Sequence, residues 1–287
     1  MTAAFPIFAY YEVKFDPFAV HFPEGWFLEG IRWYGLAYLA GFLIGLWLLN
    51  FYYKKNRSPL NPDETSSLLT YMIFGIIIGA RLGYMLFYDF DHFAREPMSV
   101  FYITKGGMAS HGGFIGVAIA LALFSKIHKV EFFKLSDLIA LVATPGIFLG
   151  RIANFVNGEL WGKVSNVPWA MRFPASDPTQ PVSQIAPRHP SQLYEAFAEG
   201  LLIFVILQIR FFKSKPPTGQ ITGEFFILYA IARIVCEIFR EPDVGVSLIK
   251  IGSLELSRGT FYSLFCLVLG IIFVAIAQAR AKKRELK

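Results

Sequence analysis

Seven long apolar stretches dominate this sequence, and a transmembrane helix needs only about 20 predominantly apolar residues. Hydrophobic residues make up 55% of the chain and charged residues only 17%, a composition that excludes an ordinary soluble domain. We therefore expect an all-α integral membrane protein with seven transmembrane helices. The stretches cover residues 31–53, 68–88, 112–129, 135–156, 192–212, 221–240 and 259–280.

Basic residues gather after alternate apolar stretches, at residues 54–57, 126–134, 210–215 and 280–287. Loops rich in lysine and arginine face the cytoplasm in multi-pass membrane proteins. An odd number of spans puts the two termini on opposite sides, so we expect an external amino terminus and a cytoplasmic carboxyl terminus. The net charge of +6 is thereby assigned to membrane topology, and no nucleic-acid partner is expected.

The sequence shows no boundary between separate domains. We expect a single membrane domain over residues 1–287, with an external loop or cap at 157–191, where six prolines and many polar residues interrupt the apolar pattern. The first residues lack a cationic start followed by a continuous apolar core, so no cleavable signal peptide is expected. Cys236 and Cys266 lie in apolar stretches without metal-ligand spacing, and we interpret them as packing residues.

Polar residues occupy one level of the predicted bundle. Even-numbered stretches run outward and odd-numbered ones run inward, so late residues of the former and early residues of the latter share the outer half of the bilayer. The opposite halves are almost purely apolar. Ionisable residues at membrane depth are costly and mark functional sites. The residues at this level are Tyr34, Arg81, His111, Arg151, Asn154, Tyr194, Glu195, Glu199, Tyr229, Arg233 and Glu237.

Three arginines at this level need partners, because an arginine at the centre of a membrane helix costs roughly 2.5 to 3.5 kcal/mol on insertion scales. Nearby glutamates would satisfy a single buried arginine, and we interpret Arg81 as a structural pair of this kind. Arg151 and Arg233 have two interpretations, either pairing with carboxylates or binding a phosphate, whose oxygens match the guanidinium group bidentately. The asparagines and the histidine predicted at the same level favour phosphate.

His111 opens the third apolar stretch in the sequence SHGG. Imidazole titrates near neutral pH, so this residue is either a general base or a histidine that hydrogen-bonds locally at a helix start. The five histidines show no metal-ligand spacing, and neither a metal nor another cofactor is expected.

Two further segments are interpreted structurally. The sequence RHPSQLYE at 188–195 is typical of a helix start, in which Ser191 or Gln192 would satisfy free backbone amides. Arg240 has two interpretations: it belongs to a charged stop at the water boundary, or it continues the polar face of the sixth stretch and holds Glu237 or Glu241 in place.

Four segments carry most of the polar residues within the apolar background: GRIANFVNGELWG at 150–162, HGG at 111–113, RHPSQLYE at 188–195 and YAIARIVCEIFREPD at 229–243. Together they resemble the prolipoprotein diacylglyceryl transferase family of the bacterial cytoplasmic membrane. The first segment satisfies every specified position of the family signature. The resemblance extends from about Tyr34 to the last apolar stretch.

The resemblance implies transfer of the diacylglyceryl group of phosphatidylglycerol to the lipobox cysteine thiol in the signal peptide of a preprolipoprotein. This step forms a thioether, releases glycerol phosphate and begins lipoprotein maturation. The resemblance also implies a multi-pass protein of the bacterial inner membrane, in contact with membrane lipids and with its active site toward the outer leaflet.

The resemblance assigns roles to individual residues. Catalytic roles are implied for His111, Arg151 and Arg233. Asn157 is added to the substrate-binding set because it lies in the signature segment, and Arg240 is added because it lies near Arg233 in the sequence. Asn157, Glu159 and Gly162 are also expected to form the turn into the external loop. The other substrate-binding residues are Tyr34, Arg151, Asn154, Glu159, Gly162, Tyr229 and Glu237.

This chemistry suits the residue types. Breaking the bond between the glycerol carbon and the phosphate oxygen leaves negative charge on phosphate, which fixed arginines in a dry site stabilise. The thiol must lose its proton, and His111 or a carboxylate such as Glu159 or Glu237 would accept it.

Two other classes of seven-helix protein fit the sequence less well. A retinal-type photoprotein needs a lysine in the seventh stretch, and residues 261–278 contain none, although a related receptor stays open. A transporter would be expected to show repeated halves or charges at the midplane, and neither is evident in the sequence.

Overall fold

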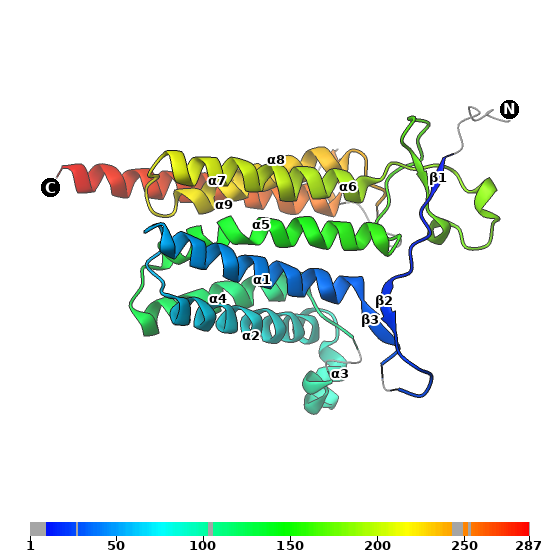
Figure 1. Cartoon of the computed structure of the whole chain (residues 1–287), viewed down its shortest axis with the longest axis horizontal. Helices are drawn as coiled ribbons and strands as arrows, with labels where there is room; N and C mark the ends of the chain where they lie inside the picture. The colour runs from blue at the N-terminus through cyan, green and yellow to red at the C-terminus, as the bar shows by residue number, and fades with distance from the viewer. Residues whose placement is uncertain (1–9, 27, 103–105, 243–248, 252–253, 287) are drawn as a thin grey trace. The chain divides into compact units, whose positions relative to one another are not determined.

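Helices make up most of this computed structural model, which describes residues 10–26, 28–102, 106–242, 249–251 and 254–286 (Figure 1). Large apolar side chains such as Trp47 and Phe114 are exposed along the helices, as expected where lipid is the solvent. The all-α membrane class is confirmed. Five of the described helices are long and apolar enough to cross a membrane, namely α1 (Trp33–Lys54), α2 (Pro62–Phe87), α4 (Ser110–His128), α5 (Phe132–Val156) and α9 (Arg258–Glu285).

The fifth and sixth predicted spans are also helical but differ from the other five. Residues 191–213 form α6 (Ser191–Glu195), a π-helical turn η5 (Ala196–Leu202) and α7 (Ile203–Lys213) in succession. The helix α8 (Gln220–Glu237) carries three charged residues. Neither is among the five long apolar helices in the described part of the chain, because one is divided and the other is too charged.

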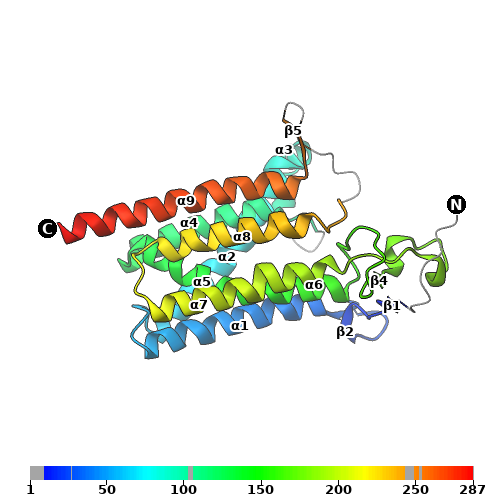
Figure 2. The same cartoon turned by 90° about the horizontal axis from the view of Figure 1, so that it is seen from above.

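The chain forms two compact units, residues 1–45 with 140–287 and residues 46–139. The first unit contains α6 to α9, and Figure 2 shows α8 and α9 running in opposite directions beside each other. The second contains α2, α3 (Phe90–Arg95) and α4. The helices α1 and α5 pass from one unit into the other along the chain.

Short strands organise the remainder of the first unit. The strand β1 (Tyr11–Glu12) pairs in parallel with β4 (Met171–Arg172), so the segment predicted as a cap is tied to the amino-terminal residues. The strands β2 (Phe18–His21) and β3 (Gly30–Arg32) form an antiparallel hairpin that leads into α1. The other short elements among the described residues are η1 (Pro97–Phe101), η3 (Pro174–Ser176), η4 (Val182–Gln184), β5 (Ile249–Ile251) and β6 (Leu254–Leu256).

In the second unit, α2 and α4 pack backbone to backbone through glycines. A Cβ atom built on Gly75 would lie 2.6 Å from the carbonyl oxygen of Gly116, and one built on Gly79 would lie 2.4 Å from that of Gly112. A side chain at either position would force the helices apart, so the close packing requires glycine.

Arg81 is buried in the second unit, where it is 5% exposed. Its Nε donates to the carbonyl of Val100 (3.1 Å), Nη1 donates to those of Gly106 (2.6 Å) and Gly107 (3.0 Å), and Nη2 donates to that of Ser99 (2.5 Å). The prediction that a carboxylate pairs with Arg81 is therefore wrong. Instead, η1 and the glycines at 106 and 107 present carbonyl oxygens at the guanidinium group.

A polar network joins α7, α8 and α9 in the first unit. Arg210 Nε donates to both carboxylate oxygens of Glu224 (3.0 and 3.2 Å), Gln220 Nε2 donates to Glu224 Oε1 (2.7 Å), and Gln278 Nε2 donates to Gln220 Oε1 (2.7 Å). These residues lie at the end of α8 away from Arg233. The prediction that this half of the bundle is almost purely apolar is wrong, because Arg210 of α7 and Gln220 of α8 itself satisfy the carboxylate of Glu224.

Candidate active site

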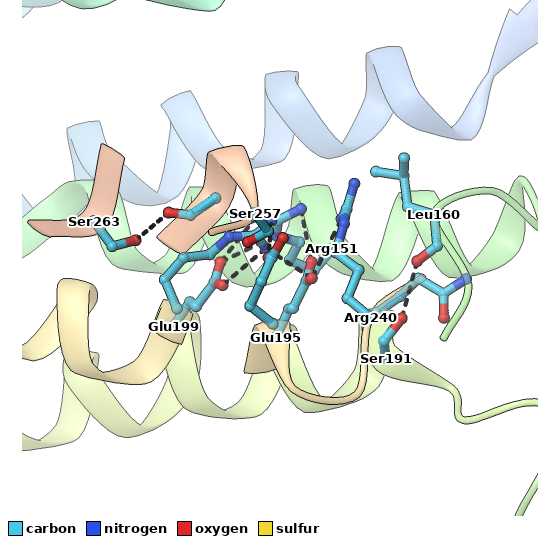
Figure 3. Close-up of polar contacts among 12 residues, drawn as sticks. Arg151, Leu160, Ser191, Glu195, Glu199, Arg240, Ser257 and Ser263 are labelled. Atoms are coloured by element: carbon cyan, nitrogen blue, oxygen red, sulfur yellow. Dashed lines mark hydrogen bonds and ion pairs between the residues drawn. The ribbon is translucent and has the colours of Figure 1, made fainter. Parts of the chain in front are cut away.

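Six charged side chains form a largely buried cluster in the first unit (Figure 3). Their formal charges cancel, since three are arginines and three are glutamates. They come from α5 (Arg151), from α6 and η5 (Glu195 and Glu199), from α8 (Arg233 and Glu237) and from the residues just after α8 (Arg240).

Arg151 contacts both glutamates of the α6–η5 segment. Its Nη2 and Nε donate to Glu199 Oε2 at 2.9 and 3.2 Å, and its Nη1 lies 2.8 Å from Glu195 Oε2. The guanidinium plane is therefore held by two carboxylates one helical turn apart.

Arg233 contacts three carboxylates. Its Nη1 donates to Glu195 Oε1 (2.7 Å) and to Glu199 Oε1 (3.3 Å), and its Nη2 lies 2.9 Å from Glu237 Oε2 on the next turn of α8. Arg151 and Arg233 thus share Glu195 and Glu199, which brings the two arginines into one group as predicted.

Burial differs sharply within the cluster. The side chains of Glu195 and Glu199 are fully buried (0% exposed), whereas those of Arg151 and Arg233 remain 18% and 12% exposed. Two buried carboxylates near each other require compensating charge, which the arginines supply. The glutamates therefore support the arginines from within, and each arginine side chain stays partly accessible.

Arg240 belongs to the cluster itself, since its Nη1 donates to Glu195 Oε1 at 3.3 Å. Arg240 was expected to hold Glu237 or Glu241, and the structure instead shows it bonded to Glu195. Pairing of residues 161–163 with 239–241 keeps Arg240 in place, and Gly162 and Arg240 form an antiparallel bridge.

Gly162 lies where three segments meet. Its backbone N–H donates to the carbonyl of His189 (2.9 Å), and a Cβ atom at this position would lie 2.6 Å from the carbonyl oxygens of His189 and Phe239. Partial burial lowers the pKa of His189, so its imidazole is neutral at neutral pH. Gly162 is required by backbone packing that supports Arg240.

The segment that carries Glu195 and Glu199 is shaped by close packing. A Cβ atom on Gly200 would lie 2.6 Å from Cα of Phe148, so the π-helical turn approaches the backbone of α5. Single π-helical turns occur frequently at functional sites. The wider turn places Glu195 and Glu199 beside Arg151 of the same α5 helix.

The start of α6 is anchored differently from the prediction. Ser191 Oγ donates to the carbonyl of Leu160 (2.9 Å) and Gln192 Nε2 donates to that of Glu159 (2.6 Å), so these side chains do not cap the helix amides. Both are fully buried. They fasten the turn after α5 to the start of α6.

A second polar group lies at the end of α5. The Nδ2 atoms of Asn154 and Asn157 donate to Glu159 Oε1 at 2.8 and 3.3 Å, and the amide of Glu159 donates to the carbonyl of Asn154 (3.1 Å). Since α5 ends at Val156 and Gly158 has a positive φ of 64°, the predicted turn into the loop is confirmed.

Of the two tyrosines predicted in the site, Tyr229 interacts with the cluster and Tyr34 is linked to it only through Tyr38. Tyr229 lies one turn before Arg233 on α8 and interacts electrostatically with Glu199 and Arg151. Tyr34 accepts a long hydrogen bond from Tyr38 (3.3 Å), whose hydroxyl is within electrostatic range of Arg151. The first unit therefore contains every predicted site residue except one.

His111 is that exception, because it belongs to the second unit. It is the second residue of α4 and is exposed. The prediction that it lies level with Arg151 and Arg233 stays a prediction.

Sequence reasoning placed Glu195 and Glu199 at the right level but left them out of the site. They are the residues that join the arginines. Their spacing of four residues on a helix, directly after RHPSQLY, was a usable signal, because two carboxylates on one face of a membrane helix need cationic partners. Cys236 and Cys266 are both free thiols, as expected for packing residues.

Comparison with known proteins gives a consistent result. A family model described as prolipoprotein diacylglyceryl transferase matches residues 25–276. The chain is 41% identical to the phosphatidylglycerol–prolipoprotein diacylglyceryl transferase of Idiomarina loihiensis over 94% of each chain. It is 42% identical to that of Pseudoalteromonas translucida, over 88% of this chain and 91% of the relative. It is 45% identical to that of Rhodospirillum centenum, over 77% and 79%.

Proposed function

Because this chain belongs to the prolipoprotein diacylglyceryl transferase family, it is a membrane transferase of lipoprotein biosynthesis, and we propose that its arginine–glutamate cluster binds the phosphate of phosphatidylglycerol. The observation that carries this proposal is the difference in burial within the cluster. Glu195 and Glu199 are fully buried, whereas the side chains of Arg151 and Arg233 stay partly accessible. A lipid phosphate is expected to approach the two arginines from their accessible side while the glutamates hold both guanidinium groups in position.

The proposed reaction joins the lipid to a cysteine of a prolipoprotein. The thiolate sulfur attacks the phosphate-bearing carbon of the diacylated glycerol. A carbon–sulfur bond forms there, and the bond between that carbon and the phosphate oxygen breaks. The electron pair of the broken bond stays on the departing glycerol phosphate. Arg151 and Arg233 stabilise this charge in a site that excludes most water.

A base must remove the thiol proton. We assign this role to His111, with Glu159 or Glu237 as the alternative, because an imidazole is the usual proton acceptor at neutral pH. No enzyme nucleophile is required, since the substrate thiol is itself the attacking group.

The remaining site residues are assigned supporting roles. Asn154, Asn157 and Glu159 form a hydrogen-bonded group at the end of α5 that is suited to the glycerol hydroxyls of the headgroup. Tyr34 and Tyr229 are assigned to the rim of the lipid site. Glu237 and Arg240 orient Arg233 and Glu195, and Gly162 keeps Arg240 in place.

The finer topology is part of the same proposal. We assign all seven helical stretches to the bacterial inner membrane, with the amino terminus outside, the carboxyl terminus in the cytoplasm and the cluster toward the outer leaflet. Support comes from the basic residues after alternate stretches. The segment 157–191 would then form an external cap, and the lipobox cysteine of a signal peptide would reach the cluster from the membrane.

A transfer assay tests this proposal directly. Purified protein is incubated with phosphatidylglycerol labelled in its acyl chains and with a lipobox peptide, and the products are separated. We expect labelled thioether peptide and equimolar glycerol phosphate. A matched peptide with serine in place of the cysteine should give neither product. Failure to label the cysteine peptide would contradict the proposed chemistry.

A further inference from the structure

The first turn of α9 lies against the carboxylate of Glu237. A Cβ atom built on Gly259 would lie 2.6 Å from Oε2 and 2.7 Å from both Cδ and Oε1 of Glu237. These distances are shorter than real Cβ contacts, so only glycine leaves room for the carboxylate here. Figure 3 includes Ser257, the residue that caps α9, in the same close-up as the cluster.

The helices α8 and α9 are also packed closely at a distance from Glu237. Cβ atoms built on Gly223 and Gly270 would each lie within 2.8 Å of the carbonyl oxygen of the other residue, so α8 and α9 are already in backbone contact. Because the two helices run in opposite directions (Figure 2), this contact and the one at Gly259 lie toward opposite ends of the pair. The close helix spacing brings the first turn of α9 onto Glu237.

The carboxylate and the turn that faces it are both held by other contacts. Arg233 Nη2 lies 2.9 Å from Glu237 Oε2, and the Glu237 side chain is only 11% exposed. Ser257 Oγ accepts the amide proton of Thr260 (3.1 Å), and Ser263 Oγ donates to the carbonyl of Gly259 (2.7 Å). The amino-terminal end of a helix also favours a neighbouring carboxylate.

We propose that Gly259 is a positioning residue of the transferase, because its lack of a side chain lets α9 hold the Glu237 carboxylate against Arg233. Gly259 contacts no reacting atom and acts through Glu237. This inference rests on the proposed role of Arg233 in binding the lipid phosphate.

Substitution of Gly259 by alanine has a defined consequence. The new Cβ displaces the end of a side chain and leaves the helix backbones in place, so the variant still folds. The displaced carboxylate releases one side of the Arg233 guanidinium group. We expect kcat to fall about tenfold while KM for phosphatidylglycerol changes less than about threefold, because orientation in the transition state is lost.

A shorter carboxylate makes the inference specific. In Glu237→Asp protein the acid group ends one methylene earlier and leaves space for an alanine at position 259. Gly259→Ala is therefore expected to change kcat by less than about twofold in that background, and this coupling is what a double-mutant cycle measures. An equal loss in both backgrounds overturns the proposal.

Gly146→Ala is the matched control, since it adds the same methyl group to α5 of the same unit, where no heavy atom lies within 4 Å of the new Cβ. We expect it to leave both the thermal midpoint and kcat per folded molecule close to the parental values. If the Gly259→Ala loss only follows the folded fraction, the positioning role is overturned.

Two further measurements separate this inference from the proposed function. Arg233→Lys in the same assay reports on phosphate binding: if it loses activity while Gly259→Ala keeps the parental kcat, only the positioning role is overturned. Thermal midpoints of Gly259→Ala, Glu237→Ala and the double variant test the contact without any turnover. Additive midpoints would overturn the contact, and non-additive midpoints support it even if the proposed phosphate role fails.

Discussion

The two units of this protein stabilise buried arginines in opposite ways. In the second unit, Arg81 is 5% exposed and donates to four backbone carbonyls from one neighbouring segment. In the first unit, Arg151 and Arg233 contact carboxylates carried by other turns and helices and stay 18% and 12% exposed.

This difference distinguishes a structural arginine, Arg81, from the two arginines of the candidate site. Carbonyl oxygens surround all three nitrogens of Arg81, so its donors are committed to one segment of backbone. Carboxylates on separate elements neutralise Arg151 and Arg233, orient them and leave both side chains partly accessible. An arginine at membrane depth is therefore not by itself a sign of a binding site, and the identity of its partners decides between the two roles.

The largest effect is expected when Arg151 or Arg233 of the first unit is changed. Arg151→Lys and Arg233→Lys keep the charge that Glu195 and Glu199 need but lose the planar fork. We expect kcat/KM for transfer to fall about 10²- to 10³-fold, as when one transition-state donor is removed. Arg210→Lys, which changes an ion-paired arginine of α7 away from the cluster, is the control in the same assay. Near-parental activity in the cluster variants would give those arginines the same purely structural role as Arg81.

The second unit contributes to chemistry only if His111 is the base. We expect His111→Gln to lower kcat roughly 100-fold, within the usual range for a general base. Stopped assays with phosphatidylglycerol and the lipobox peptide measure this loss. Retained turnover in the variant would shift the role to Glu159 or Glu237.

Arg81 should affect stability far more than turnover. Arg81→Ala leaves several buried carbonyls without a donor, and we expect a loss of at least about 3 kcal/mol in the free energy of unfolding. The molecules that remain folded should keep kcat within about threefold. Thermal unfolding in detergent, with the exposed Arg95→Ala as control, measures the difference. A large loss of kcat in fully folded protein would contradict the structural role.

The smallest effect is expected at the network that joins α7 and α8. Glu224→Gln removes a charge from an ion pair with Arg210 whose side chains are 22% and 35% exposed, and such pairs contribute less than about 1 kcal/mol. We expect transfer activity within about twofold of the parent. A loss comparable to that of the cluster variants would show that ion pairs between these helices matter wherever they occur.

Local patterns predicted much of the architecture. Apolar length located seven helical stretches because a helix in lipid must satisfy its own backbone, and this constraint acts along one continuous segment. The turn after α5 was predicted at Asn157, Glu159 and Gly162 in the same way. The π-helical turn at 196–202 was not predictable, since it depends on the packing of Gly200 against Phe148 of another helix.

The partners of polar side chains were harder to predict than their depth. Arg81 was expected to meet a carboxylate and instead meets carbonyls, because a returning segment fills the space beside α2. Ser191 and Gln192 were expected to cap their own helix and instead bind carbonyls of the turn after α5. In each case the partner comes from a segment that is distant in the sequence, and the spacing of residues along the chain does not identify such a partner.

By itself, the sequence determined that this chain is a helical membrane protein, which family it resembles, and at which positions its costly polar groups lie, because hydropathy and helical spacing are properties of single segments. Only the tertiary structure decided that Glu195 and Glu199 join Arg151 to Arg233, that Arg81 holds backbone, and that Gly259 leaves room for Glu237. The physical reason is that each of these contacts forms between residues far apart in the chain, where helix spacing and burial, rather than local preference, select the partner.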